Sequence, residues 1–429
     1  MRRFLAACLI MLAACSSATT SPPTTTSSKV ATTVAPPPGI LSQCETPRTS
    51  PPLPTEFDAW DSPGVITTDV EIDLQGNKII SGYMTDENDF NYKDSYQTVG
   101  VDGYGFEFVA KFNPGSEFEW IHCLKETSLY HFYEGPVLDS DVNGNIYVCG
   151  STLTRWNSAG KLEWSKDFSD LSQLDCAVSS DGYSLVSGEQ TLFVSPLGDT
   201  IWTKDTPGFY EAQFLSDGNI ALATNSSLAV ISRGGLILWE HERIQRCCIG
   251  PYGDFSSGAN GNSLSTDQTG ISSDIENIVI ATTLNKAVDF DPSSKVTKLS
   301  PLWIQEAVVA KYSLSGKMQW AQKISLPRSD KTSARFVEIF DTEINDAGEI
   351  LIYGGGTASR ETDPGSSEPM HLFFVKFSPA GQQMRFLWLD EYTYLFHNLG
   401  RYFEIDSRGR LYATAESLTV PPFLLSRDL

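Results

Sequence analysis

Tryptophan recurs at one repeated position along most of this chain. Seven of the nine tryptophans occupy it, and at four of them a glycine lies four residues upstream. The seven are Trp60, Trp120, Trp164, Trp202, Trp239, Trp320 and Trp388. Recurrence every few tens of residues indicates a repeat architecture built from small, similar units. No other feature constrains the fold as strongly.

Each unit also contains a tight turn between two apolar strands. The turn sequences, such as DLQGN at 73–77 and DVNGN at 141–145, supply the Asp, Asn and Gly that tolerate a positive φ. A third apolar strand then leads through a second glycine turn to the tryptophan strand. Four short antiparallel strands per unit predict an all-β fold, a seven-bladed β-propeller.

Two details of this propeller remain open from the sequence. The stretch between Trp239 and Trp320 is long enough to contain an eighth blade. The last unit lacks its fourth strand, and residues 56–60 (EFDAW) look like that strand. We therefore expect an N-terminal strand to close the ring.

The Gly-x-x-x-Trp pattern resembles the quinoprotein-like (PQQ-type) β-propeller repeats over about residues 56–429. The resemblance implies the fold far more than a function. Quinoprotein alcohol dehydrogenases place a vicinal disulfide against the cofactor ring, and Cys247-Cys248 has that spacing. Those enzymes are much larger, however, and this sequence shows no convincing set of calcium ligands with a catalytic Asp. We therefore expect no PQQ.

The chain is strongly acidic. Its 53 Asp and Glu outnumber 31 Lys and Arg, which gives a formal charge of −22. Nucleic-acid binding needs a cationic surface, and so does electrostatic docking on anionic lipid. The composition therefore argues against both partners, while 41% hydrophobic residues suffice for a large core.

The N-terminus has the pattern of an export signal. Arg2 and Arg3 precede a short apolar run, and Leu12-Ala13-Ala14-Cys15 resembles the lipobox of bacterial lipoproteins. The resemblance implies cleavage before Cys15 and acylation there, with lipid chains such as palmitate. We expect a protein anchored by lipid to the extracytoplasmic face of the bacterial cell membrane, at the cell surface.

Residues 16 to about 55 are mostly Ser, Thr, Pro and Ala. Such a segment cannot bury a core and behaves as an extended spacer, on the order of 100 Å long. The predicted organisation is therefore a signal peptide at 1–14, a disordered tether at 15–55 and a propeller at 56–429.

Long insertions are predicted to gather on one face of the propeller. Segments 84–106, 285–306 and 355–371 each join the second strand of a unit to the third, and 246–270 joins two units. In an antiparallel blade these connections share a face, and loops on a rigid scaffold commonly carry binding. The aromatic and acidic candidates for this binding face are Phe90, Tyr92, Tyr96, Tyr104, Asp289, Asp291 and Trp303.

One turn resembles the start of a calcium-binding loop. Asp139, Asp141, Asn143 and Asn145 alternate oxygen donors, as a hard cation requires. Position twelve of that loop is Gly150 instead of a bidentate Glu, and the segment coincides with the ordinary turn of the other units. We therefore expect no metal or other cofactor, with calcium as the alternative.

Six cysteines remain once Cys15 is acylated, an even number that indicates disulfides in an exported protein. Cys149 and Cys176 fall on inner strands of adjacent blades and form the preferred pair. Cys247 and Cys248 are expected to pair locally or with distant partners.

The favoured function is a non-enzymatic binding or scaffold module for an extracytoplasmic protein. A propeller lipoprotein of the outer-membrane barrel assembly machine also joins a lipobox to quinoprotein-like blades, although without so long a tether. The alternatives are a module that binds cell-wall glycan, and an enzyme, quinone-dependent or glycan-active, working in the central funnel. We name no catalytic residue, because neither a nucleophile elbow nor a zinc-protease helix occurs in the sequence.

Overall fold

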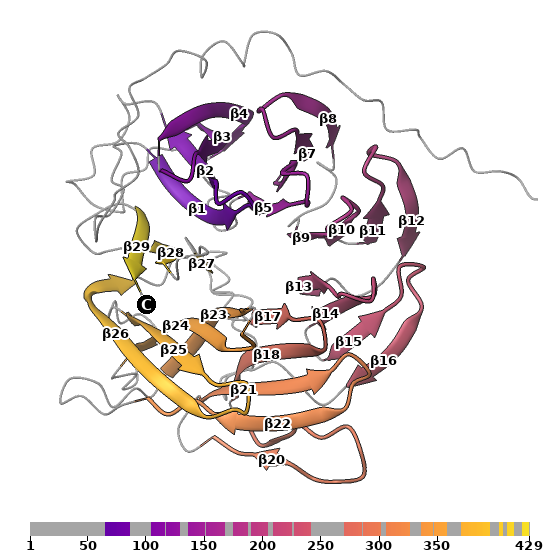
Figure 1. Cartoon of the computed structure of the whole chain (residues 1–429), viewed down its shortest axis with the longest axis vertical. Helices are drawn as coiled ribbons and strands as arrows, with labels where there is room; N and C mark the ends of the chain where they lie inside the picture. The colour runs from indigo at the N-terminus through magenta and orange to yellow at the C-terminus, as the bar shows by residue number, and fades with distance from the viewer. Residues whose placement is uncertain are drawn as a thin grey trace, which may run out of the picture. The chain divides into compact units, whose positions relative to one another are not determined.

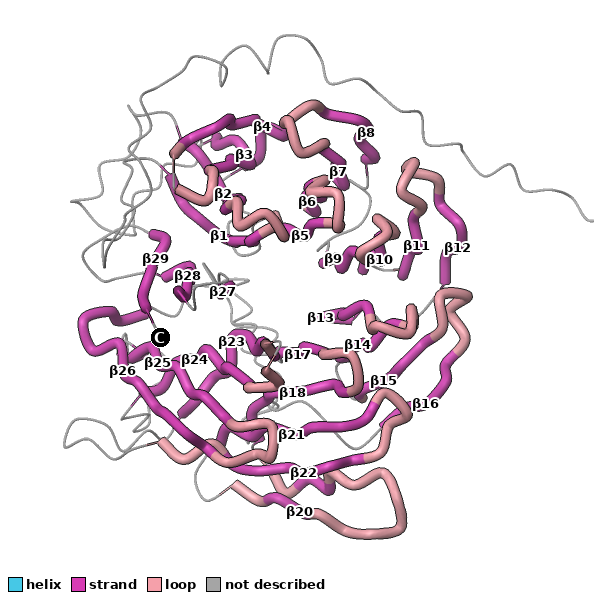
Figure 2. The backbone as a smooth tube through the Cα atoms, in the orientation of Figure 1, coloured by secondary structure: helices cyan, strands magenta, loops and turns pink. Residues whose placement is uncertain are grey.

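The computed structural model describes the greater part of residues 65–428. The described ranges are 65–85, 104–128 without 116, 136–167 without 151, 175–204 without 188–189, 209–241 without 225–226, 270–326 without 285 and 302–305, 336–357 without 346, 370–394, 403–405, 410–415 and 423–428. Within these ranges every regular element is a β-strand, as Figures 1 and 2 show. The predicted all-β class is confirmed.

Six four-stranded antiparallel sheets follow one another along the chain, and we call them blades 1 to 6. Blade 1 is formed by β1 (Val65–Ile72), β2 (Lys78–Thr85), β3 (Tyr104–Phe112) and β4 (Phe118–Ser128). Blade 2 is formed by β5 (Val137–Ser140), β6 (Ile146–Cys149), β7 (Thr152–Trp156) and β8 (Leu162–Asp167). Blade 3 is formed by β9 (Asp175–Val178), β10 (Ser184–Ser187), β11 (Thr191–Val194) and β12 (Thr200–Lys204).

Blades 4 to 6 repeat this order of strands. Blade 4 is formed by β13 (Phe209–Phe214), β14 (Ile220–Thr224), β15 (Leu228–Ile231) and β16 (Ile237–His241). Blade 5 is formed by β17 (Gly270–Ser273), β18 (Asn277–Leu284), β21 (Glu306–Ser313) and β22 (Met318–Lys323). Blade 6 is formed by β23 (Phe336–Ile344), β24 (Ile350–Thr357), β25 (Met370–Phe377) and β26 (Gln383–Tyr394).

A three-stranded sheet follows blade 6 and consists of β27 (Phe403–Ile405), β28 (Arg410–Ala415) and β29 (Phe423–Asp428). The prediction of seven or eight four-stranded blades is therefore corrected for the described residues, which contain six. The segment between Trp239 and Trp320 contributes one blade and a short hairpin, β19 (Val288–Asp289) with β20 (Lys298–Leu299). Residues 56–60, the predicted closing strand, lie outside the described ranges.

The three-stranded sheet packs between blade 6 and blade 1. Phe403 on β27 stacks edge-on against Tyr353 and Phe374 of blade 6. Tyr412 on β28 packs with Val70 and its neighbours in blade 1, and the Lys78 ammonium lies 5.4 Å from its ring centroid. The first and last described sheets are thus in contact.

The hydrophobic core lies between blades and not at one central point. One cluster joins residues of blade 4, such as Val230, to residues of blade 5, such as Ile280, and another joins Val279 of blade 5 to Ile352 of blade 6. The inner strands of a blade, such as β6 and β18, bury all of their side chains, so each blade depends on its neighbours.

The repeated tryptophan makes the outermost of these contacts. The ring of Trp239 on β16 lies against the glycine turn of blade 5, and its Nε1 donates to the carbonyl of Leu314 at 2.9 Å. Gly316 in that turn has φ +81°, and a Cβ there would lie 2.8 Å from the Trp239 ring. Both the backbone conformation and the space therefore require glycine.

The same contact recurs at other blade junctions. Trp164, Trp202 and Trp320 donate to carbonyls of the next blade at 2.7 to 3.2 Å, and Trp120 packs on Gly160 of blade 2. The glycine-to-tryptophan spacing arises because one hairpin supplies a glycine to the preceding blade and a tryptophan to the following one.

Candidate functional site

Most of the predicted aromatic binding face falls outside the described residues. Phe90, Tyr92, Tyr96 and Trp303 all lie there. Tyr104 begins β3, and the structure does not describe its side chain. The structure therefore leaves these five positions as predictions.

The insertion at 285–306 is described for most of its length, and it is tied firmly to blade 5. Phe290 is fully buried in the core shared by blades 4 and 5, and its carbonyl accepts a hydrogen bond from the Tyr312 hydroxyl at 2.8 Å. The β19–β20 hairpin is built around this anchor, while Val296 at its tip is 72% exposed. The insertion thus presents a fixed tip to solvent.

The two predicted acids of this insertion shape the hairpin. Asp289 Oδ1 accepts from the backbone N–H of Asp291 at 3.2 Å and of Thr297 at 2.8 Å. Asp291 Oδ1 accepts from Ser293 N–H at 2.9 Å, and the hydrogen bonds from Ser293 hold the pKa of Asp291 below its usual value. Both carboxylates therefore stabilise the turn in the arrangement described.

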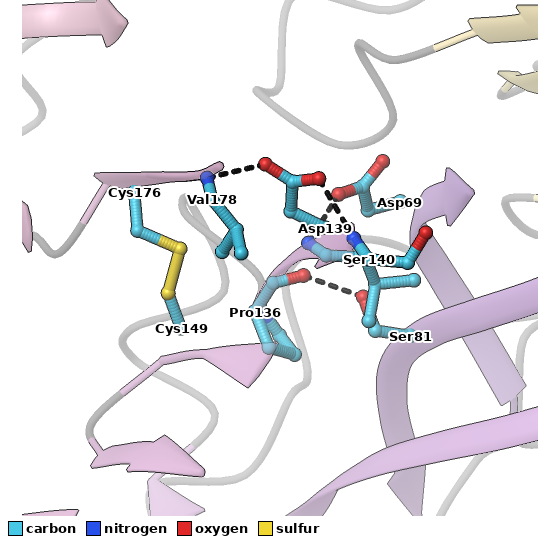
Figure 3. The surroundings of a disulfide bond; sticks show 9 residues. Asp69, Ser81, Pro136, Asp139, Ser140, Cys149, Cys176 and Val178 are labelled. Atoms are coloured by element: carbon cyan, nitrogen blue, oxygen red, sulfur yellow. Dashed lines mark hydrogen bonds between the residues drawn. A yellow bond between two sulfur atoms is a disulfide. The ribbon is translucent and has the colours of Figure 1, made fainter. Parts of the chain in front are cut away.

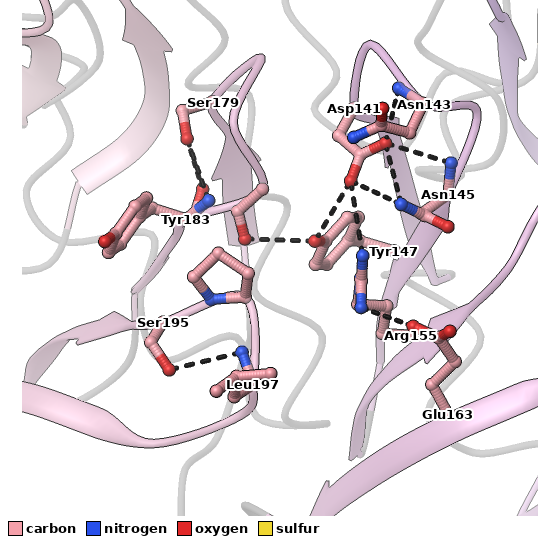
Figure 4. A network of polar contacts seen from close by, with 12 residues as sticks. Asp141, Asn143, Asn145, Tyr147, Arg155, Glu163, Ser179, Tyr183, Ser195 and Leu197 are labelled. Atoms are coloured by element: carbon pink, nitrogen blue, oxygen red, sulfur yellow. Dashed lines mark hydrogen bonds and ion pairs between the residues drawn. The ribbon is translucent and has the colours of Figure 1, made fainter.

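Three of the predicted calcium residues, Asp141, Asn143 and Asn145, lie in one turn (Figure 4), whereas Asp139 points to the next blade (Figure 3). Asp141 Oδ1 accepts from the backbone N–H groups of Asn143 and Asn145 at 2.9 and 3.0 Å, while Oδ2 accepts from Asn145 Nδ2 at 2.7 Å and lies 3.5 Å from an Arg155 nitrogen. Asp139 instead reaches blade 3, where its Oδ2 accepts from Val178 N–H at 2.5 Å.

In the described structure these oxygens hold the turn and the blade junction, and the calcium role of the four residues stays a prediction. In the part of the chain that the structure describes, no group of three or more His, Cys, Asp or Glu side chains could hold a metal ion.

The structure joins Cys149 and Cys176 by a disulfide, with their Cα atoms 6.2 Å apart (Figure 3). Cys149 ends β6 of blade 2, and Cys176 lies on β9 of blade 3, so the bond crosses a blade junction. The other predicted cysteines, Cys15, Cys247 and Cys248, lie outside the described residues.

A set of acidic residues on the innermost strands was missed in the sequence. Asp69, Asp139 and Asp341 lie on β1, β5 and β23. Each accepts a hydrogen bond from a backbone N–H of the next sheet: Asp69 from Leu138 at 2.6 Å, Asp139 from Val178 at 2.5 Å and Asp341 from Phe403 at 3.3 Å. These carboxylates connect the inner strands of neighbouring sheets.

Three glutamates lie beside them, Glu71 on β1, Glu343 on β23 and Glu404 on β27. We call the six residues the inner-rim carboxylates. Removal from water raises the pKa of all six, and the charges of the others add to this effect for Asp69, Glu71, Glu343 and Glu404. Burial raises the pKa of Glu343 to about 8, and its Oε2 has no hydrogen-bond partner among the described residues.

A signal for this cluster was present in the sequence. The acids alternate just before the first residue of the tight turn, as in Asp69-Val70-Glu71 before Asp73. Since side chains of a strand alternate between faces, such a pattern places both acids on one side. The corresponding positions two residues before the turn in blades 3, 4 and 5 are Ala177, Gln213 and Ser272. These three positions carry no charge, although Asp175 and Glu211 occupy the position two residues earlier in blades 3 and 4.

No protein-family model matches this sequence, and no curated protein does. Among solved structures, the Neurospora crassa Pan2 WD40 domain aligns over 85% of this chain and 89% of its own at 10% identity and a TM-score of 0.44. BamB from Moraxella catarrhalis aligns over 87% and 97% at 11% identity and a TM-score of 0.36.

The Dos1 propeller aligns over 87% of this chain and 94% of its own, at 9% identity and a TM-score of 0.45. The succession of four-stranded antiparallel sheets described above identifies the fold as a β-propeller. Within the described ranges, no helix is long and apolar enough to cross a membrane.

Proposed function

We propose that this protein is a lipid-anchored, extracytoplasmic scaffold that binds another protein through the face carrying its long insertions. The β19–β20 hairpin is the observation that carries the proposal. Burial of Phe290 and the Tyr312 hydrogen bond fix the hairpin, while Val296 at its tip is exposed. A rigid scaffold that holds such a tip in place loses little conformational freedom on binding.

The contrast between the two faces of the blades supports the same function. On one face the strands are joined by turns of three to five residues, stabilised by hydrogen bonds such as Gly144 N–H to the Asp141 carbonyl at 2.9 Å. On the other face, the connections between the second and third strands of blades 1, 5 and 6 are 18, 21 and 12 residues long. Variation in connection length is typical of a face that carries binding.

We further propose that residues 56–60 pair with the three-stranded sheet and complete a seventh blade. The three-stranded sheet supports this, because each of the six blades has four strands whereas this sheet has three within the described residues. Deletion of 56–60 should lower the melting temperature. An unchanged melting temperature would contradict the closure.

Partner capture tests the scaffold function. Crosslinking in intact cells, followed by affinity purification and mass spectrometry, should recover one enriched protein with the wild type. The enrichment should fall at least tenfold for Val296→Asp. Leu74→Asp is the matched control, because Leu74 is 76% exposed and lies in a turn of the opposite face.

A variant with 84–106 replaced by a short turn should also lose the partner and keep its folded state. If the partner is retained by Val296→Asp and by the trimmed variant, the proposed face is wrong. Cys15→Ser tests the anchor separately: it should abolish palmitate labelling and release the protein from the membrane fraction.

A further inference from the structure

The outer strands of blades 3 and 4 expose an unusual group of aliphatic side chains. They lie on two hairpins, 195–204 and 232–241, which end in β12 and β16. The residues, with their exposed fractions, are Leu197 (79%), Ile201 (50%), Leu236 (69%), Ile237 (63%) and Leu238 (51%). We call this set the outer apolar patch. Contiguous exposed apolar surface is characteristic of an interaction site.

The two hairpins are in direct contact. Trp202 Nε1 on β12 donates to the carbonyl of Arg233 at 2.7 Å, and the Lys204 ammonium donates to the carbonyl of Gly235. Leu236 follows directly after Gly235, so the apolar residues of β16 continue the surface that Ile201 begins on β12. Figure 1 shows both strands on the outer rim.

β16 also offers backbone hydrogen bonds. It is the last strand of its sheet and pairs only with β15 within that sheet. An apolar strand at a sheet edge is a template for another strand, and natural proteins usually protect such edges with charge. The exposed Glu240 is the one acidic residue of β16, and Leu236 to Leu238 have no charge among them.

The charge of the patch selects its partner. The hairpins contain two acids, Asp199 and Glu240, and two bases, Lys204 and Arg233, so their net charge is zero in a chain of −22. A basic partner gains nothing from a neutral surface, whereas two acidic molecules repel each other least where their surfaces are neutral.

We propose that the outer apolar patch is a homodimer interface in which β16 pairs antiparallel with β16 of a second copy. A two-fold axis at Leu238 places Leu238 beside its equivalent and keeps Glu240 away from its own. Because the β15–β16 ladder shifts register at Leu238, the strand pairing is confined to the residues on either side of this bulge. No acid then faces an acid across the pair. The interface uses neither the β19–β20 hairpin nor the segment 84–106, so it is independent of the function proposed above.

Sedimentation equilibrium of the full chain tests the dimer. The wild type should associate reversibly, and the dissociation constant should fall as NaCl rises from 50 to 500 mM, because salt screens the repulsion between two acidic molecules. Leu238→Asp should raise the dissociation constant at least tenfold with an unchanged melting temperature. Leu74→Asp, equally polar and on an exposed site of blade 1, should leave it unchanged.

Crosslinking tests the register. Residues directly opposite in an antiparallel pair are within reach of a disulfide. Leu238→Cys should therefore give a covalent dimer on mild oxidation, beyond any formed by the wild type, and Leu74→Cys should not. A wild type that stays monomeric at every salt concentration overturns the proposal. So does a dimer that Leu238→Asp leaves intact, and a dimer without the Leu238→Cys crosslink overturns the register.

Discussion

The outer and inner rims of the blades connect neighbours in different ways. On the outer rim one contact recurs, a tryptophan against the glycine turn of the next blade, as with Trp239 and Gly316. On the inner rim the connecting group changes between junctions. Asp69 accepts from Leu138 N–H, Glu211 from Ile271 N–H at 2.9 Å and the Ser272 hydroxyl from Ile344 N–H at 3.0 Å.

This difference separates what repeats from what is specific to the protein. The outer contact depends on shape and a neutral hydrogen bond, so it should be insensitive to pH. The inner rim contains carboxylates whose pKa values are raised by burial, and its contribution to stability should depend on pH. The following predictions test that division, from the largest expected effect to the smallest.

Substitution of the outer-rim glycine should be the most damaging change. Gly316→Val places a branched side chain at φ +81° and against the Trp239 ring, which should lower the free energy of unfolding by about 4 kcal/mol. Gly234→Val is the control, because the nearest atom to its Cβ is Ser232 Oγ at 3.7 Å. Urea denaturation followed by tryptophan fluorescence measures both, and equal losses would contradict the proposed role of the turn.

Loss of the disulfide should have the second-largest effect on the free energy of unfolding. Cys149→Ser with Cys176→Ser removes a crosslink between blades 2 and 3, and the free energy of unfolding should fall by about 3 kcal/mol. Reductant should lower the wild type to the level of the double variant and leave the variant unaffected. If reductant does not change the free energy of unfolding of the wild type, the disulfide does not contribute to stability.

The inner rim should make the protein more stable at mildly acidic pH. Removal from water raises the pKa of Asp139 and Asp341 to about 7, above their ordinary value of 3.8. Between these values the folded state binds more protons than the unfolded state, so the free energy of unfolding should fall as pH rises. Melting temperatures measured from pH 5 to 8 should decrease, and a rise across this range would contradict the raised pKa values.

Neutralising one inner-rim acid should have the smallest effect and the opposite sign. Glu343→Gln removes a half-buried negative charge that Asp341 repels, and it should raise the free energy of unfolding at pH 8 by about 1 kcal/mol. The slope between pH 5 and 8 should become shallower. The exposed Glu240→Gln is the control, and a loss of stability in Glu343→Gln would show that this carboxylate supports the fold.

The blade pattern was predictable from sequence because the outer contact requires the same residue types each time. Trp164, Trp202 and Trp239 each lie four residues after a glycine with positive φ, so spacing alone revealed four-stranded units. The count of complete blades was not predictable in this way, since the last sheet lacks a tryptophan hairpin of its own within the described residues.

The inner rim was harder to predict, because its carboxylates contact residues on neighbouring sheets. Asp139 was interpreted with its sequence neighbour Asp141 as part of one metal loop, yet the two point to different partners, Val178 and the turn. Asp69, Asp341 and Glu404 come together only when sheets distant in sequence meet around the inner rim. The spacing of these residues along the sequence does not indicate that they lie close together.

The tryptophan contacts also have a direction. Trp164, Trp202, Trp239 and Trp320 each reach forward, to a turn that is made later in the chain than the tryptophan itself. If the blades fold in order from the N-terminus, each new blade therefore has no surface on which to pack its tryptophan until the next hairpin is available. The turn that each indole contacts lies about thirty to eighty residues further along the chain. The tryptophan contact of each blade is thus completed only after the next blade has formed its hairpin.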